Sequence, residues 1–306
     1  GQSGPICDGL RDEALMALES DLILDRSRLK RRLTFWRVTA VLAAALLIIF
    51  TIGRFSGYGG KDHIAALDIQ NIIVDDAERN EVLAEIAEDD QVKAVLVRIN
   101  SPGGTVVGGE SLFISLRRIA EKKPVVAVMG ELATSAGYMA AVAADYIIGR
   151  QSTITGSIGV IMQTTDITGL LGKIGIKPEA IKSAPLKAQP NPLEPMSSAA
   201  RQAAQDVISD MYDMFVTMVS ERRNMDKATA KRLADGRVYT GRQAVKNGLI
   251  DALGGEKEAL AWLNKNKGIT KSIPVRALKI RRADGILQRI GDELFGKTLF
   301  SERLRL

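Results

Sequence analysis

From about residue 62 onward, short apolar runs alternate with amphipathic stretches, and this pattern limits the fold more than any other feature. Strands that alternate with helices are typical of an α/β fold in which helices cover the strands. We therefore expect a βα-rich domain. The predicted strands are residues 64–69, 92–99, 125–129, 146–148, 158–162 and 178–181, and the predicted helices are residues 80–88, 108–119, 135–143, 197–221, 227–233, 241–246 and 256–263.

The composition is that of a globular protein: 46% of the 306 residues are hydrophobic and 25% are charged. The single cysteine, Cys7, excludes a framework of intramolecular disulfides. The net charge is +6, but the basic excess is concentrated beside an apolar segment and near the end of the chain. This distribution does not indicate a nucleic-acid partner.

The apolar segment that precedes the folded region has 16 uncharged positions between Arg37 and Arg54. A membrane-spanning helix needs about 20 mostly apolar residues, and neighbouring aromatic residues extend this segment on both sides. We predict a retained transmembrane anchor at residues 38–55. Basic residues are more numerous before it than after it, which orients the N-terminus toward the cytoplasm. A cleaved signal peptide is the alternative, and no Ala-x-Ala cleavage site follows the segment.

The last part of the chain, residues 269–306, is basic and amphipathic. It alternates apolar residues such as Ile280 and Ile290 with arginines such as Arg281 and Arg289. Three interpretations remain open for this tail. Docking on a neighbouring subunit and disorder are together favoured over contact with anionic lipid.

Ser135 is a candidate nucleophile because it lies where the apolar strand 125–129 gives way to a helix of small residues. A serine at the start of a helix has free N–H groups and a favourable helix dipole nearby. The backbone N–H of Ala136 is then available to a developing negative charge. The alternative is that Ser135, or Thr134, merely caps the helix.

The base that would activate Ser135 has few candidates. His63 is the only histidine and Cys7 is the only cysteine, and both lie near or before the apolar segment. A lysine is therefore the expected base, and such a lysine must be desolvated to become neutral near pH 7. Lys187 lies in a loop bounded by prolines, and Lys182 is its rival. Either one is also interpretable as an ordinary surface lysine.

Two adjacent glycines, Gly103 and Gly104, end the segment Asn100-Ser101-Pro102-Gly103-Gly104 after the strand 92–99. Glycines at the carboxyl end of a strand allow backbone N–H groups to approach a ligand, as an oxyanion hole requires. The alternative is a simple Pro-Gly turn.

Together with four other segments, this motif resembles the signal peptide peptidase A group of serine proteases in its short bacterial form. The other segments are Thr134-Ser135-Ala136-Gly137-Tyr138, Thr155-Gly156-Ser157-Ile158-Gly159-Val160, Ile181-Lys182-Ser183-Ala184-Pro185-Leu186-Lys187 and Asp235-Gly236-Arg237-Val238-Tyr239-Thr240-Gly241. The resemblance extends from about residue 64 to residue 263. It implies a crotonase-like (caseinolytic-protease-like) fold that carries an N-terminal transmembrane helix.

The resemblance also implies a role for each site residue. Ser135 corresponds to the nucleophile, Lys187 to the general base of a Ser-Lys dyad, and Ser157 to the serine whose hydroxyl holds the lysine amine. The oxyanion hole corresponds to the backbone N–H groups of Gly103 or Gly104 and of Ala136. Ala136 and Ala184 stand where the family often has glycine. Neither departure removes a functional atom.

The implied function is that of a membrane-anchored serine endopeptidase that degrades remnant signal peptides without a cofactor or metal. The implied domains are a cytoplasmic segment (1–37, in which 1–15 have no periodic pattern), the anchor (38–55), a catalytic domain (62–268) and the tail (269–306). The resemblance implies a bacterial inner-membrane protein with a periplasmic catalytic domain and a homo-oligomer, an octameric ring whose sites include neighbouring protomers. Alternatives are a stomatin-partner-type protease, a catalytically silent membrane scaffold and a crotonase-type acyl-CoA enzyme.

Overall fold

The computed structural model describes residues 35–48 and 62–280, and the chain divides into two units, Gly1–Lys61 and Asp62–Leu306. In the first unit, residues 35–48 form a helix with exposed side chains. Among the helices of the described residues, none combines the length and the apolar character needed to cross a membrane. The predicted cytoplasmic segment (1–37), the predicted anchor (38–55) and the predicted tail (269–306) each lie partly outside the described residues.

The second unit is built on one sheet of eight strands, with the order β6-β5-β3-β2-β1-β8 and with β4 and β7 branching from β3. All neighbours pair in parallel except β5 and β6, which are antiparallel. The strands are β1 (His63–Ile73), β2 (Val92–Gly104), β3 (Val125–Thr134), β4 (Tyr146–Gly149), β5 (Ile154–Gly156), β6 (Val238–Thr240), β7 (Ala252–Leu253) and β8 (Val275–Ala277).

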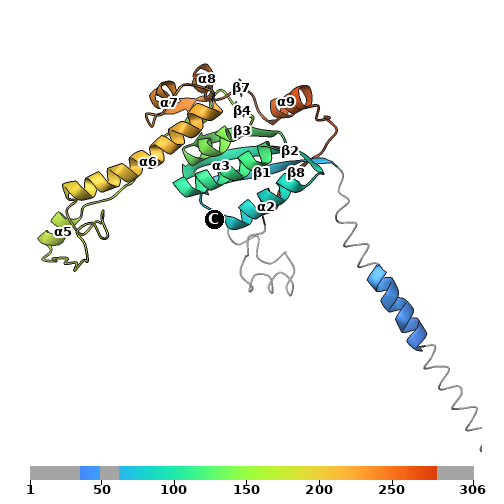
Figure 1. Ribbon diagram of the computed structural model, residues 1–306, viewed down its shortest axis with the longest axis horizontal. Coiled ribbons are helices and arrows are strands. Elements are labelled where there is room, and N and C mark those ends of the chain that lie inside the picture. The colour runs from blue at the N-terminus through green and yellow to red at the C-terminus, as the bar shows by residue number, and fades with distance from the viewer. Residues whose placement is uncertain (1–34, 49–61, 281–306) are drawn as a thin grey trace, which may run out of the picture. The chain divides into compact units, whose positions relative to one another are not determined.

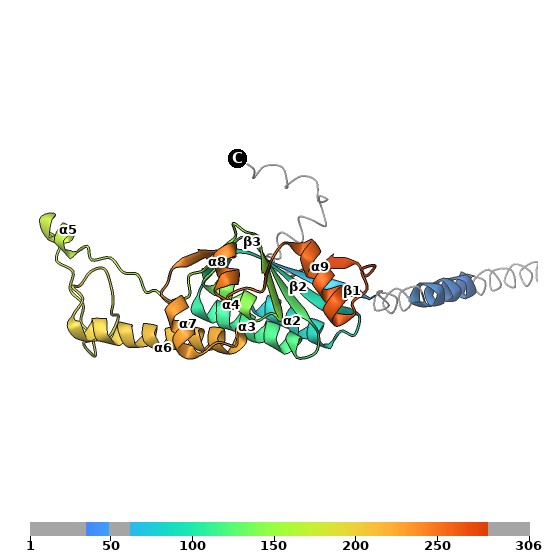
Figure 2. The same cartoon turned by 90° about the horizontal axis from the view of Figure 1, so that it is seen from above.

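Eight helices of this unit accompany the strands along the chain, and several of them cover the sheet (Figure 1). They are α2 (Ala77–Glu88), α3 (Val106–Ala120), α4 (Ala136–Val142), α5 (Thr168–Lys173), α6 (Ser198–Arg222), α7 (Lys227–Leu233), α8 (Gly241–Lys246) and α9 (Glu256–Lys267). Figure 2 shows α2 and α3 against one face of the sheet and α9 against the other.

Side-chain alternation along the central strands divides the core between these two faces. Odd-numbered residues such as Val95 and Val97 belong to the larger core, which α2, α3 and α4 cover. Even-numbered residues such as Ala94 and Leu96 belong to the smaller core beneath α9. Strands buried on both faces are expected to be almost continuously apolar, as the run Val92–Ile99 is.

The strand β3 changes partners along its length, and this change prepares the candidate site. Val126–Met129 pair with β4, whereas Leu132–Thr134 pair with β5. The strand extends beyond its predicted end at Met129, because the short β5 supplies a hydrogen-bonding partner as far as Thr134. The extra residues carry the chain to the position where α4 begins.

We define the arm as residues 159–209, which comprise the coil after β5, α5 and the first half of α6. Figures 1 and 2 both show α5 and this half of α6 standing away from the sheet. Ala200 is the only buried residue of the arm, whereas Phe215, Val216 and Val219 bury the second half of α6 in the core.

The strands predicted at 158–162 and 178–181 are wrong, because both segments are coil. Most of each segment lies away from the core: Ile161 is 82% exposed and Ile181 is fully exposed, although Ile158 is buried. The helix α5 was not predicted.

At the other end of the domain, β8 extends the sheet into the segment predicted to be the tail. Leu278 and Ile280, which follow β8, pack against the larger core.

Candidate functional site

Ser135 occupies a strained turn between β3 and α4. Its backbone has φ 54° and ψ −122°, a conformation that non-glycine residues rarely adopt. Its side chain makes no capping hydrogen bond to α4, so the interpretation of Ser135 as a simple N-cap is wrong. Backbone strain of this kind persists where the surroundings enforce it, and it is concentrated at functional sites.

Three other non-glycine residues also have positive φ, and two of them lie at or beside residues singled out by the sequence. They are Asn71, Ser157 and Ala188, the last of which follows Lys187 directly. In the described residues only Asn224 adds a fifth such backbone. The strained positions therefore concentrate in the segments that carry the candidate chemistry.

The helix α4 holds Ser135 in place because every one of its residues is buried. The hydroxyl of Tyr138 donates to the carbonyl of Leu249 at 2.8 Å, and burial raises the pKa of this phenol far above its ordinary value. The hydroxyl therefore remains a donor. Because α4 begins at Ala136, the backbone N–H of Ala136 belongs to the first turn, where a helix supplies no acceptor of its own.

Two guanidinium groups hold the other end of α4. Arg222 donates to the carbonyls of Val142 and Ala144 at 3.2 and 3.0 Å, and Arg117 donates to Ala143 at 2.9 Å. Burial, followed by repulsion from Arg117, lowers the pKa of Arg222. Cations at a helix C-terminus are favourable, so these contacts fix the helix whose other end carries Ser135.

We expect Arg222→Ala to lower the free energy of unfolding by about 2 kcal/mol, because two part-buried carbonyls lose a charged donor. Arg201→Ala is the matched control, since Arg201 is an exposed arginine of the same helix. Denaturant unfolding of both variants measures the difference. Equal stabilities would show that Arg222 does not hold α4.

Ser157 lies beside Ser135, at the end of the neighbouring strand β5. The backbone N–H of Ser135 donates to the carbonyl of Gly156 at 2.9 Å, and the N–H of Ser157 donates to Arg237 at 2.8 Å. Gly156 has φ +84°, and a Cβ there would lie 2.7 Å from the ring of Tyr239. The structure thus brings together the two serines that the sequence analysis selected.

The glycine loop approaches Ser135 from β2. A Cβ on Gly103 would lie 2.7 Å from Ser135 Cβ and 3.2 Å from the backbone nitrogen of Ala136. The N–H of Gly103 donates to the hydroxyl of Ser101 at 3.1 Å. The simple Pro-Gly turn is wrong, because β2 continues through Gly104, which pairs with Ile73 of β1.

Lys187 is exposed and lies in the arm. Within the described residues, no hydrogen bond or ion pair joins its amine to Ser135 or Ser157. Its rival Lys182 is engaged: its amine contacts the carboxylate of Glu194 at 2.5 Å, and that hydrogen bond lowers the pKa of Glu194. Gln189 donates to the same carboxylate at 2.6 Å. Lys182 therefore stabilises the arm itself.

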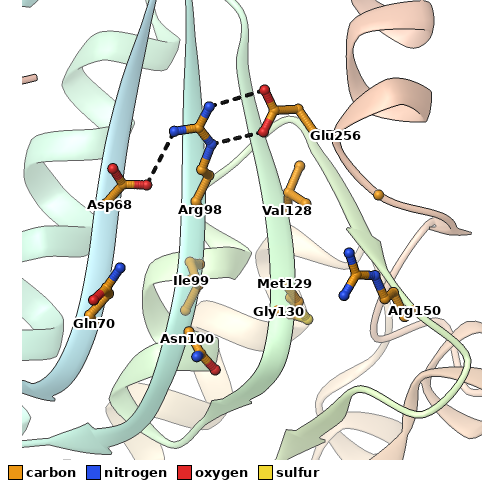
Figure 3. Close-up of a pocket in the computed structure, with 11 residues that line it drawn as sticks. Asp68, Gln70, Arg98, Ile99, Asn100, Val128, Met129, Gly130, Arg150 and Glu256 are labelled. Carbon is orange, nitrogen blue, oxygen red and sulfur yellow. Dashed lines mark hydrogen bonds and ion pairs between the residues drawn. The ribbon is translucent and has the colours of Figure 1, made fainter. Parts of the chain in front are cut away.

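Two cavities lie away from Ser135. One, of about 250 Å³, opens on the α9 side of the sheet, where Arg98 donates twice to Glu256 and once to Asp68 (Figure 3). The other, of about 180 Å³, lies within the arm and is lined by residues that include Leu186 and Ala204. Across residues 35–48 and 62–280, no three His, Cys, Asp or Glu side chains lie close enough to hold a metal ion.

The structure adds two residues to those that sequence reasoning selected for their chemistry. Ser101 and Thr134 lie within the motifs, and their buried hydroxyls bond to the glycine loop. The sequence shows that both residues carry a hydroxyl group, but it does not show which groups these hydroxyls bond to once they are buried.

Several known proteins resemble this chain in sequence. Residues 117–270 match Peptidase family S49. A putative protease of Methanocaldococcus jannaschii is 34% identical over 235 residues, which are 74% of this chain and 76% of that protein. A putative signal peptide peptidase SppA of Enterococcus faecium is 35% identical over 221 residues, 68% of this chain and 64% of that protein.

Protease 4 of Haemophilus influenzae is 32% identical over 217 residues, and the matched part is 68% of this chain but only 35% of that protein. Among solved structures, 1510-N, a membrane-bound stomatin-specific protease, superposes with a TM-score of 0.50 at 17% identity, over 72% of this chain and 99% of that one. That likeness concerns the fold, a mixed α/β sheet. The chain belongs to peptidase family S49.

Proposed function

We propose that this chain is a serine endopeptidase in which Ser135 is the nucleophile and Lys187 is the general base. The strained backbone at Ser135 carries the proposal. It presents a hydroxyl that does not cap α4, beside the first N–H of this buried helix and against Gly103. A serine protease requires this combination of an accessible nucleophile and nearby backbone donors.

We propose the following steps for the reaction. The neutral amine of Lys187 takes the proton of Ser135 Oγ while Oγ bonds to the substrate carbonyl carbon. The N–H of Ala136 and an N–H of the glycine loop stabilise the resulting oxyanion. The lysine then protonates the leaving amine as the peptide bond breaks, and water hydrolyses the acyl-enzyme with the lysine again as base. The hydroxyl of Ser157 positions the amine.

Against Lys182 stands its contact with Glu194, because that carboxylate already engages the amine inside the arm. Lys187 has no such partner among the described residues. The choice between the two lysines that the residues alone left open therefore favours Lys187.

We further propose that Lys187 acts on Ser135 of a second copy of the chain. Lys187 is exposed and belongs to an arm that stands away from its own sheet (Figure 1). The arm also exposes large apolar side chains, among them Ile161, Ile174 and Ile181, and a surface of this kind favours association. Repetition of the same contact around an axis yields a closed ring, and we propose the octamer.

The remaining proposals concern location and substrate. We propose that residues 38–55 anchor the chain in the bacterial inner membrane, with the catalytic domain on the periplasmic side. Remnant signal peptides are the proposed substrates, since apolar peptides partition into the same membrane. The name of the Enterococcus faecium relative and the membrane-bound neighbour support this choice.

A fluorophosphonate probe tests the nucleophile. We expect the full-length protein to hydrolyse casein and to acquire one covalent adduct on Ser135, located by peptide mass spectrometry, and Ser135→Ala to lose both. Ser115→Ala is the control, because Ser115 is a serine of α3 outside the site. A protein that neither reacts with the probe nor hydrolyses casein would be a catalytically silent scaffold. Turnover of an acyl-CoA in place of casein would indicate a crotonase-type enzyme.

A further inference from the structure

Two buried hydroxyls hold the two ends of a single peptide group in the glycine loop. The hydroxyl of Thr134 donates to the carbonyl oxygen of Pro102 at 2.9 Å. The N–H at the other end of the same peptide group, that of Gly103, donates to the hydroxyl of Ser101 at 3.1 Å. Ser101 is 0% exposed and Thr134 is 5% exposed, so water does not compete for these bonds.

The Ser101 hydroxyl connects the loop to the next strand. Because a hydroxyl has one hydrogen, it accepts from Gly103 and donates to the carbonyl of Asn71, at 2.5 Å. Asn71 has φ 60° and lies at a register shift between β1 and β2, which turns its carbonyl toward Ser101. A second register shift lies between Ile99 and Ser101 in the pairing with β3. Bulges beside active sites redirect groups in this way.

The position of this peptide group determines where the loop meets the nucleophile. Gly103 lies so close to Ser135 that an added Cβ would be 2.7 Å from Ser135 Cβ and 3.1 Å from the carbonyl oxygen of Thr134. Rotation of the peptide group would break both hydroxyl bonds. It would also shift the loop against Ser135 and the N–H of Ala136. A displacement of about 1 Å at such a site reduces turnover on the order of 100-fold.

We propose that Ser101 and Thr134 are positioning residues for catalysis: their hydroxyls fix the Pro102–Gly103 peptide and so align the glycine loop with Ser135. This inference rests on the proposed serine-protease function. In this arrangement the two hydroxyls touch neither the substrate nor the reacting atoms. Their contribution is to hold the oxyanion-stabilising loop before the charge develops.

Thr134→Val and Thr134→Ser provide the test, because valine keeps the shape of threonine and loses the hydroxyl, whereas serine keeps the hydroxyl. Ser101→Ala removes the hydroxyl at the other end. Thr153→Val is the matched control: Thr153 is 1% exposed, and its hydroxyl donates to the carbonyl of Gly130 at 2.7 Å, away from the loop. All variants are assayed as full-length protein, well below their unfolding temperatures.

We expect Thr134→Val and Ser101→Ala to lower kcat roughly 10- to 100-fold with KM changed by less than about threefold. A peptide boronic acid forms a tetrahedral adduct with the nucleophile and resembles the transition state. Its inhibition constant should weaken by the same factor as kcat. Thr134→Ser should recover most of kcat, and Thr153→Val should lose stability while kcat stays within about threefold of wild type.

The inference is overturned if Thr134→Val turns over as fast as Thr134→Ser, or if Thr153→Val loses as much kcat as Thr134→Val. A rise in kcat for Ser101→Ala would also overturn it, because Ser101 would then withhold the Gly103 N–H from catalysis. Ser135→Ala separates this inference from the proposed function. If Ser135→Ala remains active, the nucleophile is wrong; if it is inactive while Thr134→Val is fully active, only the positioning role is wrong.

Discussion

Replacement of Lys187 by arginine should abolish peptide hydrolysis, whereas the same replacement at Lys182 should leave most of it. Arginine remains protonated at every accessible pH, so it cannot take a proton from Ser135. At position 182 the positive charge is what matters, because it pairs with Glu194 inside the arm. We expect Lys187→Arg to lower kcat by at least about 1,000-fold and Lys182→Arg to lower it less than about fivefold.

Steady-state hydrolysis of casein or of a fluorogenic peptide measures both variants. Gel filtration beside the assay establishes that each variant assembles as the wild type does, so that a loss of activity is not a loss of assembly. If Lys187→Arg retained turnover, Lys187 would not be the base. If Lys182→Arg were the inactive variant, the assignment of the two lysines would be reversed.

The substitution Gly103→Ala, which adds a methyl group, should reduce peptide hydrolysis nearly as much as Lys187→Arg. Gly103 has φ +114°, which an alanine rarely adopts, and its Cβ would lie 2.7 Å from Ser135 Cβ. Both the strain and the overlap displace the loop or the nucleophile, and Cβ atoms do not approach so closely. We expect Gly103→Ala to lower kcat at least about 100-fold, comparable with the loss of an oxyanion donor.

Gly172→Ala is the control for this substitution. Gly172 lies in α5, its φ is not in the left-handed region, and no atom lies within 4 Å of the Cβ that alanine would add. Kinetics and near-UV circular dichroism of both variants measure the effect on the site and on packing. Wild-type turnover in Gly103→Ala would show that the glycine loop does not contribute to catalysis.

Local signals in the sequence predicted the elements whose ends are fixed by their own residues. The helices at Lys227–Leu233 and Gly241–Lys246 begin and end as expected, because Asp226 and Thr240 cap them. Thr240 also forms a capping box with Gln243, which makes this helix start independent of the rest of the fold. The helix α6 also has a local start signal, since the side chain of Ser197 accepts a hydrogen bond from the backbone N–H of Ala200.

Elements that depend on distant partners were predicted poorly. The strands β5 and β8 have three residues each and exist because β3 and β1 accept them as neighbours. Conversely, Ile161 and Ile181 lie in segments predicted to be strands, yet both are exposed on the arm. An apolar run indicates that a segment needs a partner. It does not show whether that partner is the core of the same chain or the surface of a second copy.

The residues of the candidate site also differ in how well the sequence predicts their roles. The motifs predicted that Ser135, Ser157 and Gly103 have roles in one site, and the structure brings these three together through adjacent strand ends. The assignment of Lys187 stays a prediction, because its arm does not meet Ser135 within the described chain. The directions of the hydroxyl bonds of Ser101 and Thr134 depend on bulges in two strands, and no local pattern encodes them.

Mixing two inactive variants tests the central claim most directly. If Lys187 of one copy serves Ser135 of another, co-expressed Ser135→Ala and Lys187→Ala chains form some sites with both intact residues. Random assembly of equal amounts would restore about one quarter of wild-type turnover, since each site takes its serine and its lysine from different chains. If every site took both residues from one chain, the mixture would be as inactive as either variant alone, and that result would contradict the account.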